Sequence, residues 1–165
     1  MLQSDKMHTF SPKLFIDTSA IIHNYRAICD YRPNSILVPV IKSEAYGHGA
    51  VAVAKALISA GAQRLAVFNI DEATALRKAG ISAQLWLLEG VLPEKSSIEQ
   101  AIQLGDARFA LWNVEQLFSM EQIAAAANKT MKCHLKIDTG MSRLGFFPEQ
   151  IGYVLELLKQ CTHIE

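Results

Sequence analysis

The fold of this chain is indicated most clearly by residues 35–49, which read SILVPVIKSEAYGHG. The apolar run at 36–41 predicts a strand buried on both faces, as in parallel sheets that helices cover. Lys42 ends this run, and a buried ammonium group is costly unless it is paired or neutralised. A Schiff base with a carbonyl compound, notably pyridoxal phosphate, is one chemical reason for such a lysine. The alternative is that Lys42 only marks the point where the strand meets water.

The same pattern of apolar run, turn and amphipathic segment recurs along the chain. Strands are predicted at the apolar runs 14–16, 36–41, 65–68, 84–88, 109–112 and 132–137. Helical periodicity, with capping residues or a terminal glycine, predicts helices over 18–29, 49–60, 71–79, 96–104, 114–127 and 148–158. Strands that alternate with helices at this spacing indicate βα units and a parallel sheet with right-handed crossovers.

This alternation leaves two α/β architectures, an open doubly wound sheet or a (β/α) barrel. No G-x-G-x-x-G follows the early strands, so a dinucleotide-binding sheet has no local support. A complete TIM-type barrel has about 250 residues and about eight βα units. We therefore expect residues 1–165 to form one incomplete (β/α) barrel domain of about five to six units. A further strand is expected to begin at 163–165.

Composition narrows the class of protein. Sixteen basic and sixteen acidic side chains cancel, and no basic stripe indicates nucleic acid or an anionic membrane as a partner. The N-terminus has no apolar signal region, and no later segment is long enough to span a bilayer. We therefore expect a soluble cytoplasmic protein. A reducing compartment also suits the cysteines, which are too few and too scattered for a disulfide framework or a metal site: Cys29, Cys133 and Cys161.

The residues that follow Lys42 have the composition of an anion-binding turn. Gly47 and Gly49 let backbone amides approach an anion at the start of the next predicted helix, where the helix dipole favours negative charge. Tyr46 could add a hydroxyl donor to a phosphate. The alternative is a tight βα turn with a packed tyrosine and a surface His48, and for His48 we favour this second interpretation.

A second strand end, residues 135–146, also carries charged side chains. Alternation places Lys136 on the face opposite Leu135, inside the barrel, where a lysine must be paired, deprotonated or modified. The turn at 138–140 would present Arg143 over the strand ends, and its rigid fork of donors suits a carboxylate or phenolate. The alternative is a surface turn with solvated charges.

Together, the two segments resemble the alanine racemase family of fold-type III pyridoxal phosphate enzymes. The family's first hallmark is similar to V-K-A-N-A-Y-G-H-G, and residues 40–49 read VIKSEAYGHG. The second, K-x-D-T-G-M-x-R-x-G, is matched at every fixed position from Lys136 through Gly145. Shorter similar stretches, including 16–17, 23–26, 72–81 and 87–90, extend the resemblance over nearly the whole chain.

The resemblance implies a role for each of these residues. Lys42 would hold pyridoxal 5'-phosphate and act as one of two catalytic bases, and Tyr46 would contact the cofactor phosphate. Lys136 would be the lysine that is often N-carbamylated in the family, and as an anion it would orient Arg143. Arg143 would lie near the cofactor phenolate and the substrate carboxylate.

The departures from the family pattern also matter. Ser43 and Glu44 replace a small residue and an asparagine, which would place an extra carboxyl group beside Lys42. Pro39 interrupts the lysine strand and removes one donor from the ladder. The family's opposing base is a tyrosine in a C-terminal β domain, which this sequence does not contain.

We therefore predict the N-terminal part of a pyridoxal phosphate-dependent alanine racemase that supplies D-alanine for peptidoglycan. The fragment would be inactive alone, and its open sheet edges would be covered by self-association as a homodimer. One alternative is a racemase for serine, lysine or a broad range of amino acids. The other is a non-catalytic module that binds pyridoxal phosphate.

Overall fold

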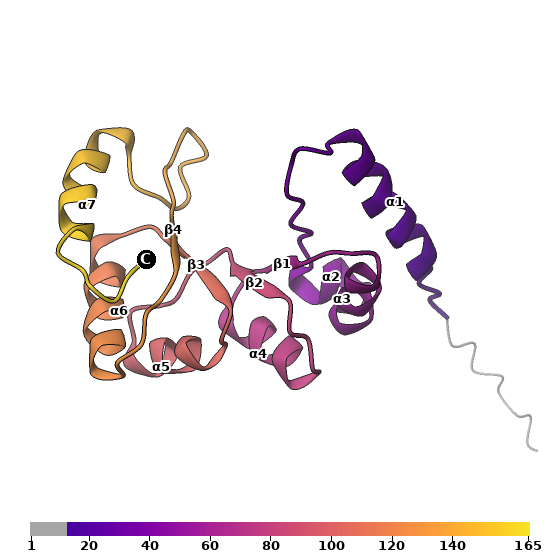
Figure 1. Ribbon diagram of the computed structural model, residues 1–165, viewed down its shortest axis with the longest axis horizontal. Coiled ribbons are helices and arrows are strands. Elements are labelled where there is room, and N and C mark those ends of the chain that lie inside the picture. The colour runs from indigo at the N-terminus through magenta and orange to yellow at the C-terminus, as the bar shows by residue number, and fades with distance from the viewer. Residues whose placement is uncertain (1–12) are drawn as a thin grey trace, which may run out of the picture.

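The computed structural model describes residues 13–165, so the N-terminal stretch, in which we expect no signal region, lies outside the described residues. Its centre is a parallel sheet whose four strands lie side by side in chain order (Figure 1). Pairs such as Leu65 with Leu85, and Phe109 with Cys133, fix the register. The strands are β1 (Arg64–Val67), β2 (Gln84–Leu87), β3 (Ala107–Leu111) and β4 (Cys133–Leu135).

Helices separate the strands as the hydrophobic periodicity predicts. Asn69 and Asn113 cap two of them, since each side-chain oxygen accepts a backbone N–H of the first turn. Asp17 caps the first helix, because its side chain accepts the N–H groups of Ser19 and Ala20. The helices are α1 (Thr18–Tyr31), α3 (Ala50–Ser59), α4 (Ile70–Lys78), α5 (Lys95–Gln103), α6 (Val114–Ala126) and α7 (Ile151–Leu158), with a 3₁₀ turn η1 (Pro148–Gln150) before α7.

Two further segments extend the sheet at its edges. Val40 forms a parallel bridge with Ala66 of β1, and Met131 forms one with Ile164 beyond α7. The expected strand start at 163–165 is therefore confirmed, because the Glu165 N–H also donates to Met131 O at 2.9 Å. Six extended segments thus follow one another in chain order, and the chain forms an incomplete (β/α) barrel, as predicted.

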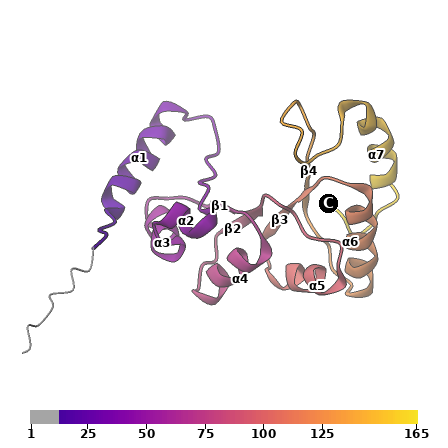
Figure 2. The same ribbon diagram turned by 180° about the vertical axis from the view of Figure 1, so that it is seen from behind.

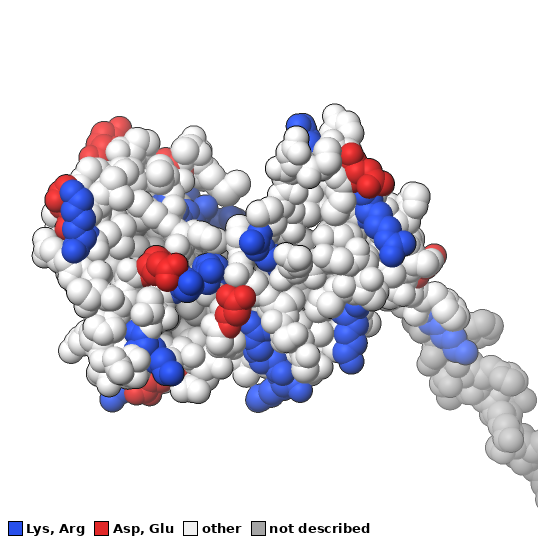
Figure 3. Space-filling view, viewed as in Figure 1, with Lys and Arg blue, Asp and Glu red and all other residues white. Residues whose placement is uncertain are grey.

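Alternation along the strands separates the two faces of the sheet. Leu65, Leu85, Leu87 and Phe109 are buried against the helices in the main hydrophobic core. Figures 1 and 2 show α4 and α5 on this side of the sheet, whereas the opposite side is open between α1 and α7. The space-filling view is hollowed at the same place, with basic side chains at its border (Figure 3).

The first two predicted strands differ from expectation. Residues 14–16 form no strand, and Leu14 and Phe15 are exposed. The run at 36–41 pairs with β1 only through its last residues, and Ile36 is 71% exposed, so burial on both faces is wrong for most of it. Its outer edge has no partner strand within residues 13–165, and Pro39 contributes only a carbonyl, which accepts the Ala66 N–H at 2.8 Å.

Candidate functional site

A cavity of about 390 Å³ opens on the inner face of the sheet. It brings together Lys42, which follows the first paired segment, Lys136, which follows β4, and Arg143 from the next loop. Each comes after the carboxyl end of a strand, where (β/α) barrels carry their chemistry. The other lining residues are Phe68, Trp86, Leu87, Leu88, Ala110, His134 and Leu144.

The lining residues give this cavity a positive charge. Three are cations and none carries a carboxylate, so the cavity suits an anionic ligand. Lys42 Nζ lies 5.8 Å from the centre of the Phe68 ring and 6.0 Å from that of Tyr46. Both distances are within the range of cation–π contacts. The amine therefore lies between two aromatic side chains at the edge of the cavity.

Lys42 begins the short element α2 (Lys42–Gly47), which is a left-handed turn. Ser43, Glu44, Ala45 and Tyr46 all have φ between +51° and +56°. Each non-glycine residue in this region costs about 1–2 kcal/mol, so the surroundings must hold the turn. Backbone hydrogen bonds from Ala45 N to Ile41 O (2.9 Å) and from Gly49 N to Glu44 O (2.8 Å) do so in part. No sequence signal predicted this element, since such a turn would be expected to use glycine.

The side chains of the turn point in different directions. Glu44 accepts the N–H of Ala50 at 3.1 Å and so caps α3, which corrects our expectation of an extra carboxyl group beside Lys42. Tyr46 is 60% exposed and does not line the cavity, although its ring lies beside the Lys42 amine. His48 Nδ1 lies 2.7 Å from the carbonyl oxygen of Ala45, so this histidine serves the geometry of the turn, as we had favoured.

The second predicted segment is a closed loop that begins and ends beside β4. Lys136 donates its N–H to Leu111 O and accepts that of Phe146, at 2.8 and 2.9 Å. Asp138 accepts the N–H groups of Ser142 and Gly140, and these bonds lower the pKa of its carboxyl group. The loop is therefore tied at its base and internally, which holds Arg143 at the cavity.

Gly145 is required where this loop returns to the strand. Its φ is +124°, and a Cβ there would lie 2.8 Å from Asp138 N and 3.0 Å from Lys136 O. Any side chain would push the two segments apart and would displace Lys136.

Three lining residues were not predicted from the sequence. Trp86 and His134 meet edge to face with ring centroids 4.3 Å apart, and Phe68 lies beside Lys42. Burial, and then the charge of Arg108, lower the pKa of His134. Two of them could have been predicted from the alternation of side chains along a strand, because Trp86 and His134 lie on the same face of the sheet as Lys136.

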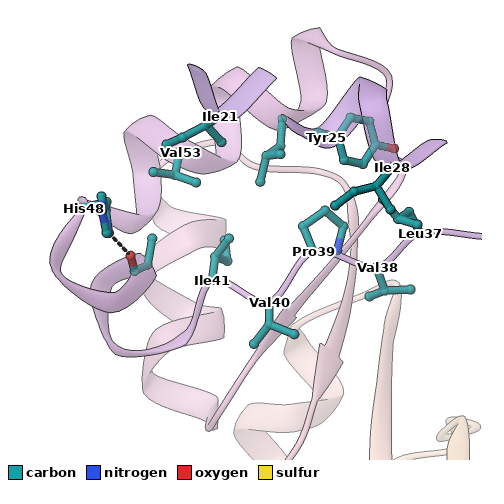
Figure 4. A pocket seen from close by; sticks show the side chains of 12 residues that line it. Ile21, Tyr25, Ile28, Leu37, Val38, Pro39, Val40, Ile41, His48 and Val53 are labelled. Carbon is teal, nitrogen blue, oxygen red and sulfur yellow. Dashed lines mark hydrogen bonds between the residues drawn. The ribbon is translucent and has the colours of Figure 1, made fainter. Parts of the chain in front are cut away.

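A second cavity lies between α1 and residues 37–41 (Figure 4). Its volume is about 410 Å³, and its lining is mostly aliphatic, with Tyr25 and His48 as the only titratable members. None of the predicted site residues lines it.

The comparisons with known proteins agree with this geometry. The family model described as "Alanine racemase, N-terminal domain" matches residues 16–165. An alanine racemase of Methylacidiphilum infernorum is 37% identical over 158 residues, which cover 90% of this chain and 40% of that protein. The chain spans about 40% of the length of the curated relatives it matches.

Solved structures are similar over the same part. The crystal structure of alanine racemase from E. faecalis has a TM-score of 0.81 and 33% identity, covering 91% of this chain and 40% of the other. A histidine racemase from Leuconostoc mesenteroides has a TM-score of 0.82 and 25% identity, covering 90% of this chain and 40% of the other. Within residues 13–165, every helix is too short or too polar to cross a membrane.

Proposed function

This chain belongs to the alanine racemase family, and we propose that it is the N-terminal, pyridoxal 5'-phosphate-binding part of an enzyme that interconverts L- and D-alanine. The observation that carries the proposal is the convergence of Lys42, Lys136 and Arg143 on one cavity. These residues come from two segments far apart in the sequence, and each segment matches one hallmark of the family. Because the chain spans about 40% of its curated relatives, racemisation is proposed for the longer protein.

The donor set of the cavity fits pyridoxal 5'-phosphate. Lys42 offers a primary amine at the cavity edge, and Phe68 and Trp86 offer flat apolar surface for an aromatic ring. Arg143 supplies positive charge for anionic oxygens. A volume of about 390 Å³ lies in the range of cofactor sites. When bound, this cofactor withdraws electrons from the α-carbon of an amino acid and so acidifies its proton.

Each residue of the chain then has a defined task. Lys42 would hold the cofactor and would move the α-proton on one face of the substrate, and Tyr46 would contact the phosphate. Arg143 would bind the substrate carboxylate or the cofactor phenolate through its paired N–H groups. Lys136, carbamylated to an anion, would orient Arg143. The modification would also explain how Lys136 can lie in one cavity with the positive side chains of Lys42 and Arg143.

The rest of the proposal concerns the longer protein. We place it in the cytoplasm as a homodimer, with alanine as its substrate and D-alanine for peptidoglycan as its product. Neither nucleic acid nor a membrane is a proposed partner. The second base, a tyrosine of the C-terminal β domain in this family, would act on the opposite face of the substrate.

A racemase for another amino acid is the second candidate. The histidine racemase from Leuconostoc mesenteroides favours it, because that protein shares this part of the fold with a TM-score of 0.82. Racemisation rates of the longer protein with alanine, serine, lysine and histidine would decide between them. A protein that binds the cofactor but racemises none of these amino acids would instead be the non-catalytic module.

Reductive labelling tests the cofactor site directly. The 165-residue chain is incubated with pyridoxal 5'-phosphate, reduced with borohydride and mapped by peptide mass spectrometry. We expect the pyridoxyl group on Lys42, and its loss in Lys42→Ala. Lys55→Ala, which removes an exposed lysine of α3, is the matched control and should leave the Lys42 label unchanged. Preferential labelling of any other lysine would overturn the proposal.

A further inference from the structure

We propose that Glu72 is a positioning residue that holds the left-handed turn of α2 and so fixes the amine of Lys42. The inference rests on the proposed function of Lys42. Glu72 lies in the first turn of α4 and touches neither the cavity nor the Lys42 side chain. It would act only through the backbone of its neighbours.

The geometry is a carboxylate shared between two backbone donors. Glu72 Oε1 accepts the N–H of Ser43 at 2.7 Å, across 29 residues of chain, and Oε2 accepts the N–H of Phe68 at 2.7 Å. Both distances are short, as expected for hydrogen bonds to an ionised acceptor. The Glu72 N–H is in turn held by the Asn69 side chain at 3.1 Å.

These two donors flank the Lys42 amine. Ser43 follows Lys42 directly and is the first residue of the left-handed run, with φ of +51°. Phe68 carries the ring that lies 5.8 Å from Lys42 Nζ. The Glu72 carboxylate therefore joins the backbone of Ser43, directly after Lys42, to the backbone of Phe68, whose ring lies near the Lys42 amine.

The left-handed turn needs such a restraint. Its four non-glycine residues all occupy a region that L-amino acids disfavour. Glu44 restrains the far end of the turn through Ala50, and Glu72 is the side chain that holds its near end, at Lys42. The acidic group also lies in the first turn of α4, where the helix dipole stabilises its charge.

Amide hydrogen exchange of the 165-residue chain tests the clamp without any cofactor. We expect protected amides at Ser43 and Phe68, and in Glu72→Gln a loss of protection of about ten- to a hundredfold at one or both. A glutamine has only one oxygen that can accept, and its NH₂ group would face an N–H donor. Asp71→Asn removes the same charge from the same helix turn and should leave both amides unchanged.

Reductive labelling with pyridoxal 5'-phosphate tests the consequence for Lys42. The ratio of label on Lys42 to label on Lys55 is measured in one sample, under conditions in which circular dichroism shows both chains to be folded, because unfolding would itself lower the ratio. We expect Glu72→Gln to lower this ratio by about tenfold. A tenfold change corresponds to about 1.4 kcal/mol of the free energy that holds the Lys42 amine in its position. Adding Ser43→Gly should restore part of it, because glycine adopts the left-handed conformation without strain.

The outcomes separate this inference from the proposed function. Unchanged amide protection and an unchanged Lys42 to Lys55 ratio in Glu72→Gln would overturn the positioning role. A lower ratio that returns to the wild-type value once the unfolded fraction is subtracted would also overturn it, as a purely structural effect. If the wild-type label lies elsewhere than Lys42, the proposed function fails, and the exchange of Ser43 and Phe68 alone decides whether Glu72 holds the turn.

Discussion

The rings of Trp86 and His134 meet edge to face across the intervening strand, with centroids 4.3 Å apart and planes at 65°. They approach above β3, where the small residue Ala110 lines the same cavity. This contact orders the floor of the cavity below Lys136, two residues further along the chain from His134.

His134 is expected to titrate below its ordinary pKa of 6.5, because burial and the Arg108 charge both disfavour the imidazolium. The unfolded chain then binds the proton more readily than the native one, so stability rises with pH through the window below 6.5. NMR titration of the imidazole protons measures this. Arg108→Gln should raise the pKa of His134, and a midpoint above 6.5 in the unmutated chain would contradict the assignment.

Arg77 is expected to be important for stability. Its guanidinium donates to the carbonyls of Leu104, Ile81, Ala83 and Asp106 at 2.7–2.9 Å and so joins the loops before β2 and β3. Arg77→Met leaves these acceptors without that donor and should lower the free energy of unfolding by about 2–4 kcal/mol. Urea denaturation measures the change.

The matched control for this variant is Lys78→Met, at the next, exposed position of α4. It should change the free energy of unfolding by no more than about 0.5 kcal/mol. Equal effects of the two variants would show that Arg77 contributes only its charge.

Gly90 and Gly80 form a natural pair for measuring close packing, because both have φ of +81°. A Cβ at Gly90 would lie 2.1 Å from Ala110 O and 2.5 Å from Gln116 Nε2, whereas nothing lies within 4 Å of one at Gly80. Gly80→Ala should cost about 1 kcal/mol from backbone strain alone. Gly90→Ala should cost about 1–3 kcal/mol more, because the packed core must shift. Thermal unfolding compares the two, and similar Tm values would refute the difference.

Carbamylation of Lys136 can be observed without activity. In ¹³C-bicarbonate we expect a carbamate carbon signal by NMR that disappears in Lys136→Arg and persists in Lys129→Arg, an exposed lysine in the turn after α6. Arg143 lines the same cavity and would stabilise the anion, so Arg143→Gln should weaken the signal. A signal that survives Lys136→Arg would assign the modification elsewhere.

Self-association of the 165-residue chain is expected at its N-terminal edge. Phe15 is 86% exposed and Ile36 is 71% exposed, beside a segment that pairs with β1 only through its last residues. Analytical ultracentrifugation should show a dimer that Phe15→Ser with Ile36→Ser converts to monomer. Tyr153→Ser, at an exposed position of α7, should not do so. A monomeric wild-type chain at high concentration would contradict this.

The sequence alone predicted the alternation of helices and strands from residue 49 onward and the identity of the three charged residues in the cavity. Alternation along β1 to β3 follows from the two-residue period of a strand, so buried residues such as Leu65 and Leu85 could be assigned to the helix-covered face from the pattern. Lys42 could be chosen because it ends an apolar run, and Lys136 because alternation places it inside the barrel. Arg143 could be chosen because a turn presents it over the strand ends. These properties are local, because they depend only on residues that are neighbours in the sequence.

The tertiary structure decided what depends on distant neighbours. The left-handed conformation of Ser43 is unfavourable on its own and exists only with partners such as Glu72, which reaches it across 29 residues. Glu44 turned towards α3 because the free N–H of Ala50 lay within its reach. The run at 36–41 had the composition of a central strand, yet only Ile41 is buried and the other five residues are exposed or partly exposed. Burial on both faces requires a second neighbouring strand, which composition cannot provide.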